Sequence, residues 1–96
     1  MTVLLKPKQG GRPIVLDKPI VLIGRHPECD VLIEVSQKIS RKDCFVAVAD
    51  NRCYVRDLES MNGVWVNGLR VTDSTLLKLG DELMIGDVPF ELVKNS

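Results

Sequence analysis

Glycine and proline interrupt this chain so often that most of it has no room for a long helix. The 96 residues include 7 glycines and 5 prolines, and both residue types end or interrupt regular helices. The one long interval without either runs from Pro27 to Gly63. Inside it, two apolar runs, 44–49 and 52–57, flank the turn-forming pair Asp50-Asn51. Even where a helix would fit, the sequence therefore predicts two strands joined by a tight turn.

The pairing of these two strands can be predicted from their side chains. If Ala49 lies opposite Arg52, then Val48 faces Cys53 and Val46 faces Val55. One face of the hairpin is then apolar, as a half-buried antiparallel pair requires.

Short apolar runs bounded by turn-forming residues continue along the rest of the chain. Further strands are expected at 3–6, 14–16, 20–23, 31–33, 64–66, 69–71, 82–85 and 88–93. Asn67-Gly68 is the strongest hairpin signal, because a type I′ turn needs a positive φ at both central residues. Gly86-Asp87 is a candidate for the same turn. About ten short strands with frequent turns indicate an all-β fold, an antiparallel β-sandwich.

The length and composition fit one globular domain covering residues 1–96, with no linker or repeat. A chain of this size buries roughly two-thirds of the surface that its unfolded form exposes. No apolar run approaches the ~18 residues of a membrane helix, and the N-terminus lacks the features of a signal peptide. A cytoplasmic location is expected.

The charge balance argues against two classes of partner. Thirteen basic and thirteen acidic residues cancel, so the chain lacks the basic excess typical of proteins that bind nucleic acid or anionic membranes. No nucleic-acid or membrane partner is predicted, and any anion must meet a local site.

The sequence offers little for a metal site, a disulfide framework or catalysis. Cys29, Cys44 and Cys53 form no C-x-x-C pair, and His26 is the only histidine. The thiols are expected to pack as small apolar groups. His26 has no evident nucleophile partner, and no phosphate-cradling or nucleophile-elbow motif occurs. No catalytic residue, metal or cofactor is therefore predicted.

The polar residues that could carry function lie in three expected loops. These are Gly24-Arg25-His26, the segment 36–43, and Glu59-Ser60-Met61-Asn62-Gly63. Loops of a sandwich can converge at one end. Arg25, Ser40 and Arg41 would then place two guanidinium groups and a hydroxyl around one point, the donor set that a phosphate dianion requires. Taken singly, each has a simpler explanation as a solvated arginine or a turn-capping serine.

Two asparagine–glycine pairs are expected to differ in role. The amide of Asn62, beside a phosphate site, could pair with the backbone of an extended peptide. Asn62-Gly63 could equally be a plain turn with a positive φ. Asn67-Gly68 lies within the tight hairpin, where a structural role is expected.

Several spaced elements together resemble the signature of the forkhead-associated (FHA) domain family. They are Gly24-Arg25, Ser40-Arg41, Asp57-Leu58-x-Ser60-x-Asn62-Gly63, Val66-Asn67-Gly68 and Leu79-Gly80-Asp81. The resemblance covers about residues 21–92. It implies an eleven-stranded sandwich of the FHA/SMAD-like type that recognises phosphothreonine through loops at one end.

The resemblance also implies roles for individual residues. Arg25, Ser40 and Arg41 match the residues that contact phosphate, and Asn62 matches the asparagine that holds the peptide backbone. Gly24, Gly63, Asn67 and Gly68 match residues that shape the loops.

The chain departs from the family pattern near the site at two positions. Asp43 replaces the histidine of Ser-Arg-x-His, and Met61 replaces a threonine that often precedes the binding asparagine. Asp43 would repel phosphate if it pointed at the site. It would order the loop if it paired with Arg41 or accepted loop N–H groups, which is the outcome we predict.

These observations favour a phosphothreonine-binding module whose partner is a protein substrate of a Ser/Thr kinase. The alternative is a module of the same fold that binds proteins or scaffolds them without phosphate, as the departures at Asp43 and Met61 would allow. A third class, an enzyme acting on a phosphoester, has no residue pattern in its support.

Overall fold

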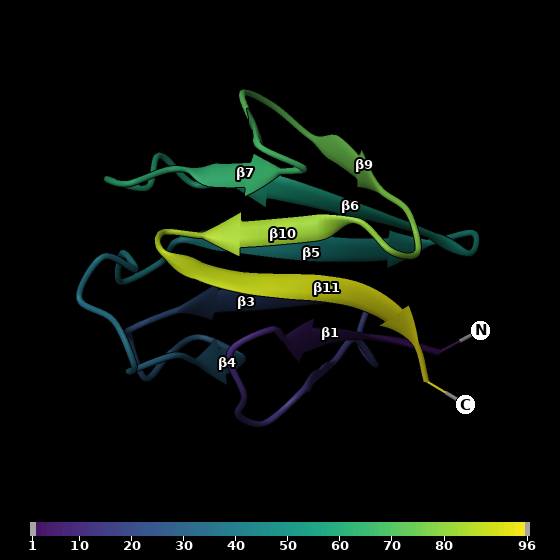
Figure 1. Cartoon of the computed structure of the whole chain (residues 1–96), viewed down its shortest axis with the longest axis horizontal. Coiled ribbons are helices and arrows are strands. Elements are labelled where there is room, and N and C mark those ends of the chain that lie inside the picture. The colour runs from purple at the N-terminus through teal and green to yellow at the C-terminus, as the bar shows by residue number, and fades with distance from the viewer. Residues whose placement is uncertain (1, 96) are drawn as a thin grey trace.

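The computed structural model of the chain describes residues 2–95, which form eleven strands packed as two sheets (Figure 1). In chain order the strands are β1 (Val3–Pro7), β2 (Ile14–Val15), β3 (Ile20–Gly24), β4 (Val31–Leu32), β5 (Cys44–Ala49), β6 (Arg52–Asp57), β7 (Val64–Val66), β8 (Leu69–Arg70), β9 (Thr75–Leu77), β10 (Glu82–Ile85) and β11 (Val88–Lys94). The described residues contain no helix with the length and apolar character needed to cross a membrane.

The two sheets make the predicted β-sandwich. Six strands pair in the order β2-β1-β11-β10-β7-β8, and five pair in the order β4-β3-β5-β6-β9. The short strand β4 runs parallel to β3, and the other pairs are antiparallel. The fold class is therefore confirmed, with one parallel pair at a sheet edge.

The hairpin registers follow the turn chemistry. β5 and β6 pair with Ala49 opposite Arg52 and Val46 opposite Val55, as predicted. Asn67 and Gly68 have φ values of 49° and 82°, which are the positive angles of a type I′ turn. The β10–β11 turn differs from this expectation. Gly86 has a φ of 60° but Asp87 is not among the positive-φ residues, so the turn has the II′ pattern.

The sequence analysis missed one strand, β9. It has only three residues, Thr75–Leu77, of which Leu77 alone is buried. Too few positions alternate for a period of two to be visible. The strand exists because β6 offers an edge with which it can pair.

The core lies between the sheets, where alternate strand residues point inward. In β5 and β6 the inward residues include Cys44, Val46, Cys53 and Val55, all buried, so the predicted apolar face is the inner one. Cys29 is also buried, and none of the three cysteines forms a disulfide. They pack as small apolar side chains, as expected.

The ends of the described chain lie together, at one end of the sandwich (Figure 1). The Asn95 N–H donates to the Thr2 carbonyl at 3.0 Å. The loops after β3, before β5 and after β6 lie at the opposite end of the sandwich (Figure 1). The loops in which function was expected are thus well separated from the chain ends.

Candidate functional site

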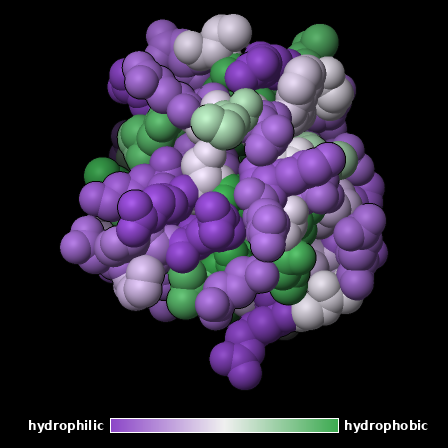
Figure 2. All heavy atoms as spheres, turned by 90° about the vertical axis from the view of Figure 1, so that its left-hand side faces the viewer, coloured by the Kyte–Doolittle hydropathy of each residue, from purple (hydrophilic) through white to green (hydrophobic). Residues whose placement is uncertain are grey.

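The three loops meet at one end of the sandwich through their backbones. Figure 2 shows this end, whose surface is mostly hydrophilic with small apolar areas between the polar side chains. The Arg25 N–H donates to the Ser40 carbonyl at 3.1 Å, and the His26 N–H donates to the Arg41 carbonyl at 3.0 Å. The loop after β3 therefore runs alongside the loop before β5.

Gly24 makes this close crossing possible. A Cβ at Gly24 would lie 2.1 Å from the carbonyl oxygen of Arg41 and 3.0 Å from the sulfur of Cys29. Because the first contact is with backbone, no side-chain rotation could relieve it. Any larger residue would push the two loops apart, so the site depends on this glycine.

Arg25 is exposed at this end, with its side chain held at one point. Its Nε donates to the Ile39 carbonyl, which anchors the guanidinium beside Ser40. No ion pair to Arg25 forms within residues 2–95. The terminal N–H groups of the guanidinium are therefore positioned and available for an anion.

Ser40 connects the second loop to the third. Its hydroxyl oxygen accepts the Met61 N–H at 2.9 Å. Since this bond uses a lone pair of the hydroxyl, the hydroxyl proton stays available as a donor. Ser40 is half-buried and Met61 is 87% exposed, so an apolar side chain stands at the surface next to a polar donor.

Asp43 lies beneath the loops, fully buried. Its Oδ2 accepts the Ser40 N–H at 2.8 Å, as predicted for a loop-ordering carboxylate, and no ion pair joins it to Arg41 within residues 2–95. Burial raises the pKa of Asp43 to about 6, opposed by the Ser40 N–H bond and assisted by the nearby carboxylate of Asp57. The Oδ1 atom is buried without a hydrogen-bond partner among residues 2–95, as is the Ser60 hydroxyl.

Asn62 forms a second link between the third loop and the second loop. Its Nδ2 donates to the Lys38 carbonyl at 3.0 Å, and its backbone carbonyl accepts the Trp65 indole N–H at 3.3 Å. Arg25 and Asn62 thus donate to successive carbonyls, those of Ile39 and Lys38, and bracket one short segment. The exposed Asn62 amide keeps its Oδ1 and one N–H for a ligand.

Gly63 follows Asn62 where a side chain would be strained. Its φ is 83°, and a Cβ there would lie 3.0 Å from the indole nitrogen of Trp65 and 3.2 Å from the Nε of Arg70. Both the backbone angle and the crowding favour glycine. The turn at Asn62-Gly63 therefore requires glycine for its backbone shape, and it also exposes the Asn62 amide.

Arg41 also lies at this end, and it contacts the first loop through its backbone. Its backbone carbonyl accepts the His26 N–H and the Cys29 thiol. The side chain lines a shallow open hollow with His26, Glu28 and Lys42, next to an ion pair of 3.4 Å between Lys42 and Glu28. Its guanidinium donates no hydrogen bond within residues 2–95.

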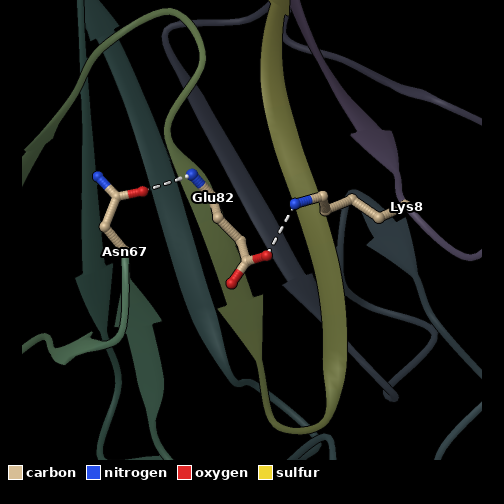
Figure 3. A network of polar contacts seen from close by, with 3 residues as sticks. All are labelled: Lys8, Asn67 and Glu82. Atoms are coloured by element: carbon tan, nitrogen blue, oxygen red, sulfur yellow. Dashed lines mark hydrogen bonds and ion pairs between the residues drawn. The ribbon is translucent and has the colours of Figure 1, made fainter.

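Asn67 lies away from these loops, in the β7–β8 turn, and its side chain forms hydrogen bonds at the start of β10. Its Oδ1 accepts the Glu82 N–H at 2.9 Å, and its Nδ2 donates to Asp81 at 3.0 Å. Glu82 in turn forms an ion pair of 2.8 Å with Lys8 (Figure 3). These contacts link the β7–β8 turn to β10 within the fold.

The sequence analysis missed two sets of groups at the loop end. One is the pair of backbone carbonyls of Lys38 and Ile39, which accept hydrogen bonds from Asn62 and Arg25. Backbone acceptors carry no residue-type signal, so only the folded loops reveal them. The other is the pair Trp65 and Arg70, whose spacing fitted an ordinary hairpin.

Comparisons with known proteins agree with this geometry. The FHA domain family matches residues 21–86. Glycogen accumulation regulator GarA of Mycobacterium tuberculosis is 38% identical over 80 residues, which cover 83% of this chain and 48% of that protein. The oxoglutarate dehydrogenase inhibitor of Corynebacterium efficiens is 35% identical over 80 residues, covering 83% and 54%. The chain thus spans about half the length of these relatives.

Solved structures share the whole fold. The FHA domain of a Chlamydia trachomatis protein matches with a TM-score of 0.89 and 26% identity, with complete coverage of both chains. EmbR of Mycobacterium tuberculosis, solved in complex with a low-affinity phosphopeptide, matches with a TM-score of 0.89 and 27% identity, covering 96% of this chain and 24% of EmbR. The family match over most of the chain and the shared sandwich show that this chain belongs to the FHA domain family.

Proposed function

We propose that this chain is a phosphopeptide-binding module that recognises phosphothreonine in partner proteins. The observation that carries the proposal is the bracketing of one loop segment by Arg25 and Asn62, which donate to the carbonyls of Ile39 and Lys38, with Ser40 next along that segment and its hydroxyl bonded to the Met61 N–H. A phosphate dianion needs charged and neutral donors held close together. Arg25 and Ser40 supply both kinds without an internal anion to displace.

Each residue has a distinct role in this proposal. Arg25 and Ser40 bind the phosphate oxygens, and Arg41 adds positive charge from the adjoining hollow. Asn62 holds the backbone of the bound segment through the donor and acceptor that its internal bond leaves free. The apolar side chain of Met61 lies beside the bound phosphoresidue.

We further propose that the chain acts by binding and without turnover, as a single domain in the cytoplasm. The relatives are named as an inhibitor and a regulator, and EmbR was solved with a phosphopeptide bound. The partner is then a protein phosphorylated by a Ser/Thr kinase.

The second candidate is a module that binds proteins without phosphate. The exposed Met61 and the buried Asp43, in place of the family's usual residues, favour it. Asp43 points beneath the loops and accepts the Ser40 N–H, so it leaves the donor set of the phosphate site intact. This geometry favours the phosphate-dependent function.

The two functions separate in one binding experiment. A library of phosphothreonine peptides is screened against the domain, with and without phosphatase treatment, and hits are measured by calorimetry. The proposed function requires that removal of the phosphate abolish binding. Equal affinity for treated and untreated peptides would establish the phosphate-independent module, and phosphate release during incubation would reveal an enzyme.

A further inference from the structure

Arg70 is held in a fixed position next to the third loop. It lies directly opposite Trp65 in the β7–β8 pair, and its guanidinium carbon is 5.6 Å from the centroid of the Trp65 ring. Val64 and Val66 are buried, so strand alternation places Trp65 and Arg70 on the outer face of the six-stranded sheet. A guanidinium over an indole face gains cation–π attraction and loses part of its rotational freedom.

This arginine also borders the loop that carries Asn62. A Cβ at Gly63 would lie 3.2 Å from the Nε of Arg70 and 3.3 Å from its guanidinium carbon. The same indole that supports Arg70 donates its N–H to the Asn62 carbonyl at 3.3 Å. Arg70 is therefore placed relative to Asn62 by two contacts through Trp65 and Gly63.

The guanidinium of Arg70 has no counter-ion within the part of the chain that the structure describes. The ion pairs among residues 2–95 involve Lys8, Lys18 and Lys42 as the cations. The Arg70 side chain donates no hydrogen bond to any residue from 2 to 95. It is exposed. Arg70 is therefore positioned, exposed and without an ion pair among residues 2–95, next to a proposed ligand contact, as Arg25 is beside Ser40.

We infer that Arg70 forms a second anion subsite, which binds an acidic side chain of the same peptide whose phosphothreonine is held at Arg25. This inference rests on the proposed function. The ligand group is a carboxylate or a second phosphate, because both accept two parallel N–H bonds from the guanidinium fork. Trp65 holds Arg70 before the ligand arrives, so less conformational entropy is lost on binding.

The subsite makes the domain selective for sequence as well as for phosphate. An extended peptide advances about 3.3 Å per residue, so an acidic residue reaches Arg70 only at one position or at two neighbouring ones. A side chain that only capped the Trp65 ring would produce no such dependence on peptide sequence.

The test uses phosphothreonine peptides with alanine elsewhere and a single glutamate placed in turn at each of the four positions on either side. The readout is the ratio of Kd values for the alanine and glutamate peptides. For the wild type we expect glutamate to tighten binding about three- to tenfold at one position or two neighbouring ones. A parallel series with phosphoserine at the preferred position separates a carboxylate site from a phosphate site by which binds more tightly.

Variants of the arginine complete the test. Arg70→Gln should reduce the ratio to about one at the preferred position, and Arg70→Lys should retain part of it, since lysine keeps the charge but loses the planar fork. Arg52→Gln, an exposed arginine at the β5–β6 turn, is the matched control and should keep the wild-type ratio.

The outcomes distinguish this inference from the function on which it rests. Wild type that requires phosphothreonine but shows no glutamate preference, or an Arg70→Gln variant that keeps the preference, would overturn the subsite alone. Wild type that binds threonine and phosphothreonine peptides equally would overturn the proposed function and the subsite with it.

Discussion

At the scale of single residues, Arg25 tests the phosphate site most directly. Within residues 2–95, only the Nε of its guanidinium donates a hydrogen bond, to the Ile39 carbonyl. We expect Arg25→Ala to lower phosphopeptide affinity beyond detection, because each charge-assisted hydrogen bond contributes about 1.5–3 kcal/mol. Arg25→Lys should recover only part of the loss. Calorimetry gives the affinities, with Arg52→Ala as control, and unchanged affinity in Arg25→Ala would remove the phosphate site.

Asp43 predicts a pH dependence of stability. Its pKa in the folded chain is about 6, above the ordinary value of 3.8, so between those values the folded state binds more protons than the unfolded state. The free energy of unfolding therefore falls as pH rises through this window. Each unit of pKa difference is equivalent to about 1.4 kcal/mol.

The variant Asp43→Asn isolates this effect. Its side chain keeps an acceptor for the Ser40 N–H but does not ionise. We expect Asp43→Asn to gain stability relative to the wild type as pH is raised from 4 to 7, measured by urea unfolding at each pH. A difference between the two proteins that stays constant with pH would show that Asp43 does not titrate in this range. Stability is the better readout, since phosphothreonine itself titrates near pH 6.

At the scale of elements, the β7–β8 turn is stabilised by both its angles and its side chain. Asn67→Ala should lower the free energy of unfolding by about 1–3 kcal/mol, since it puts alanine at a positive φ and removes the bonds to Asp81 and Glu82. Thermal melts measure the loss, and phosphopeptide affinity should be retained well below the melting temperature.

Two further variants divide that loss into its parts. Asn67→Gly relieves the backbone angle but still lacks the side-chain bonds. Asn51 also has a positive φ, 61°, and donates no side-chain hydrogen bond to residues 2–95, so Asn51→Ala reports the backbone cost alone. Normal melting with lost peptide binding in Asn67→Ala would instead place Asn67 in the binding site.

The elements also show what the sequence could predict. The β5–β6 register was predictable because six alternating residues on each strand and one turn all favoured the same pairing. β9 was missed because three residues carry no period, and the parallel β3–β4 pair depends on long-range packing. The convergence of Arg25, Ser40 and Asn62 was expected only through their spacing and resemblance. The carbonyl acceptors and Arg70 needed the folded backbone.

At the scale of the whole molecule, the proposed binding loops and the described chain ends lie at opposite ends of the sandwich (Figure 1). Paired strands fill the space between them. The loops are bonded to one another through Asn62 and Lys38, and to β3 through the Asp43 N–H, which donates to the Ile23 carbonyl. Attachments at either end of this chain should therefore leave the loops accessible.

The pairing of β1 with β11 has a consequence for how the chain folds. Val3 lies opposite Lys94, so this contact must close almost the entire chain into a loop, at an entropic cost that local hairpins do not bear. We expect β5–β6 and β10–β11 to form early and the β1–β11 ladder to form late.

A circular permutant reverses that order. Joining Asn95 to Thr2 through a short glycine linker makes β11 and β1 a hairpin, and opening the chain between Asp50 and Asn51 makes β5 and β6 distant in sequence. In pulsed hydrogen exchange, amides of β1 should become protected earlier than in the natural chain, and those of β5 later. The same native sandwich would then be reached by a different route, set by which strand pairs are neighbours along the chain.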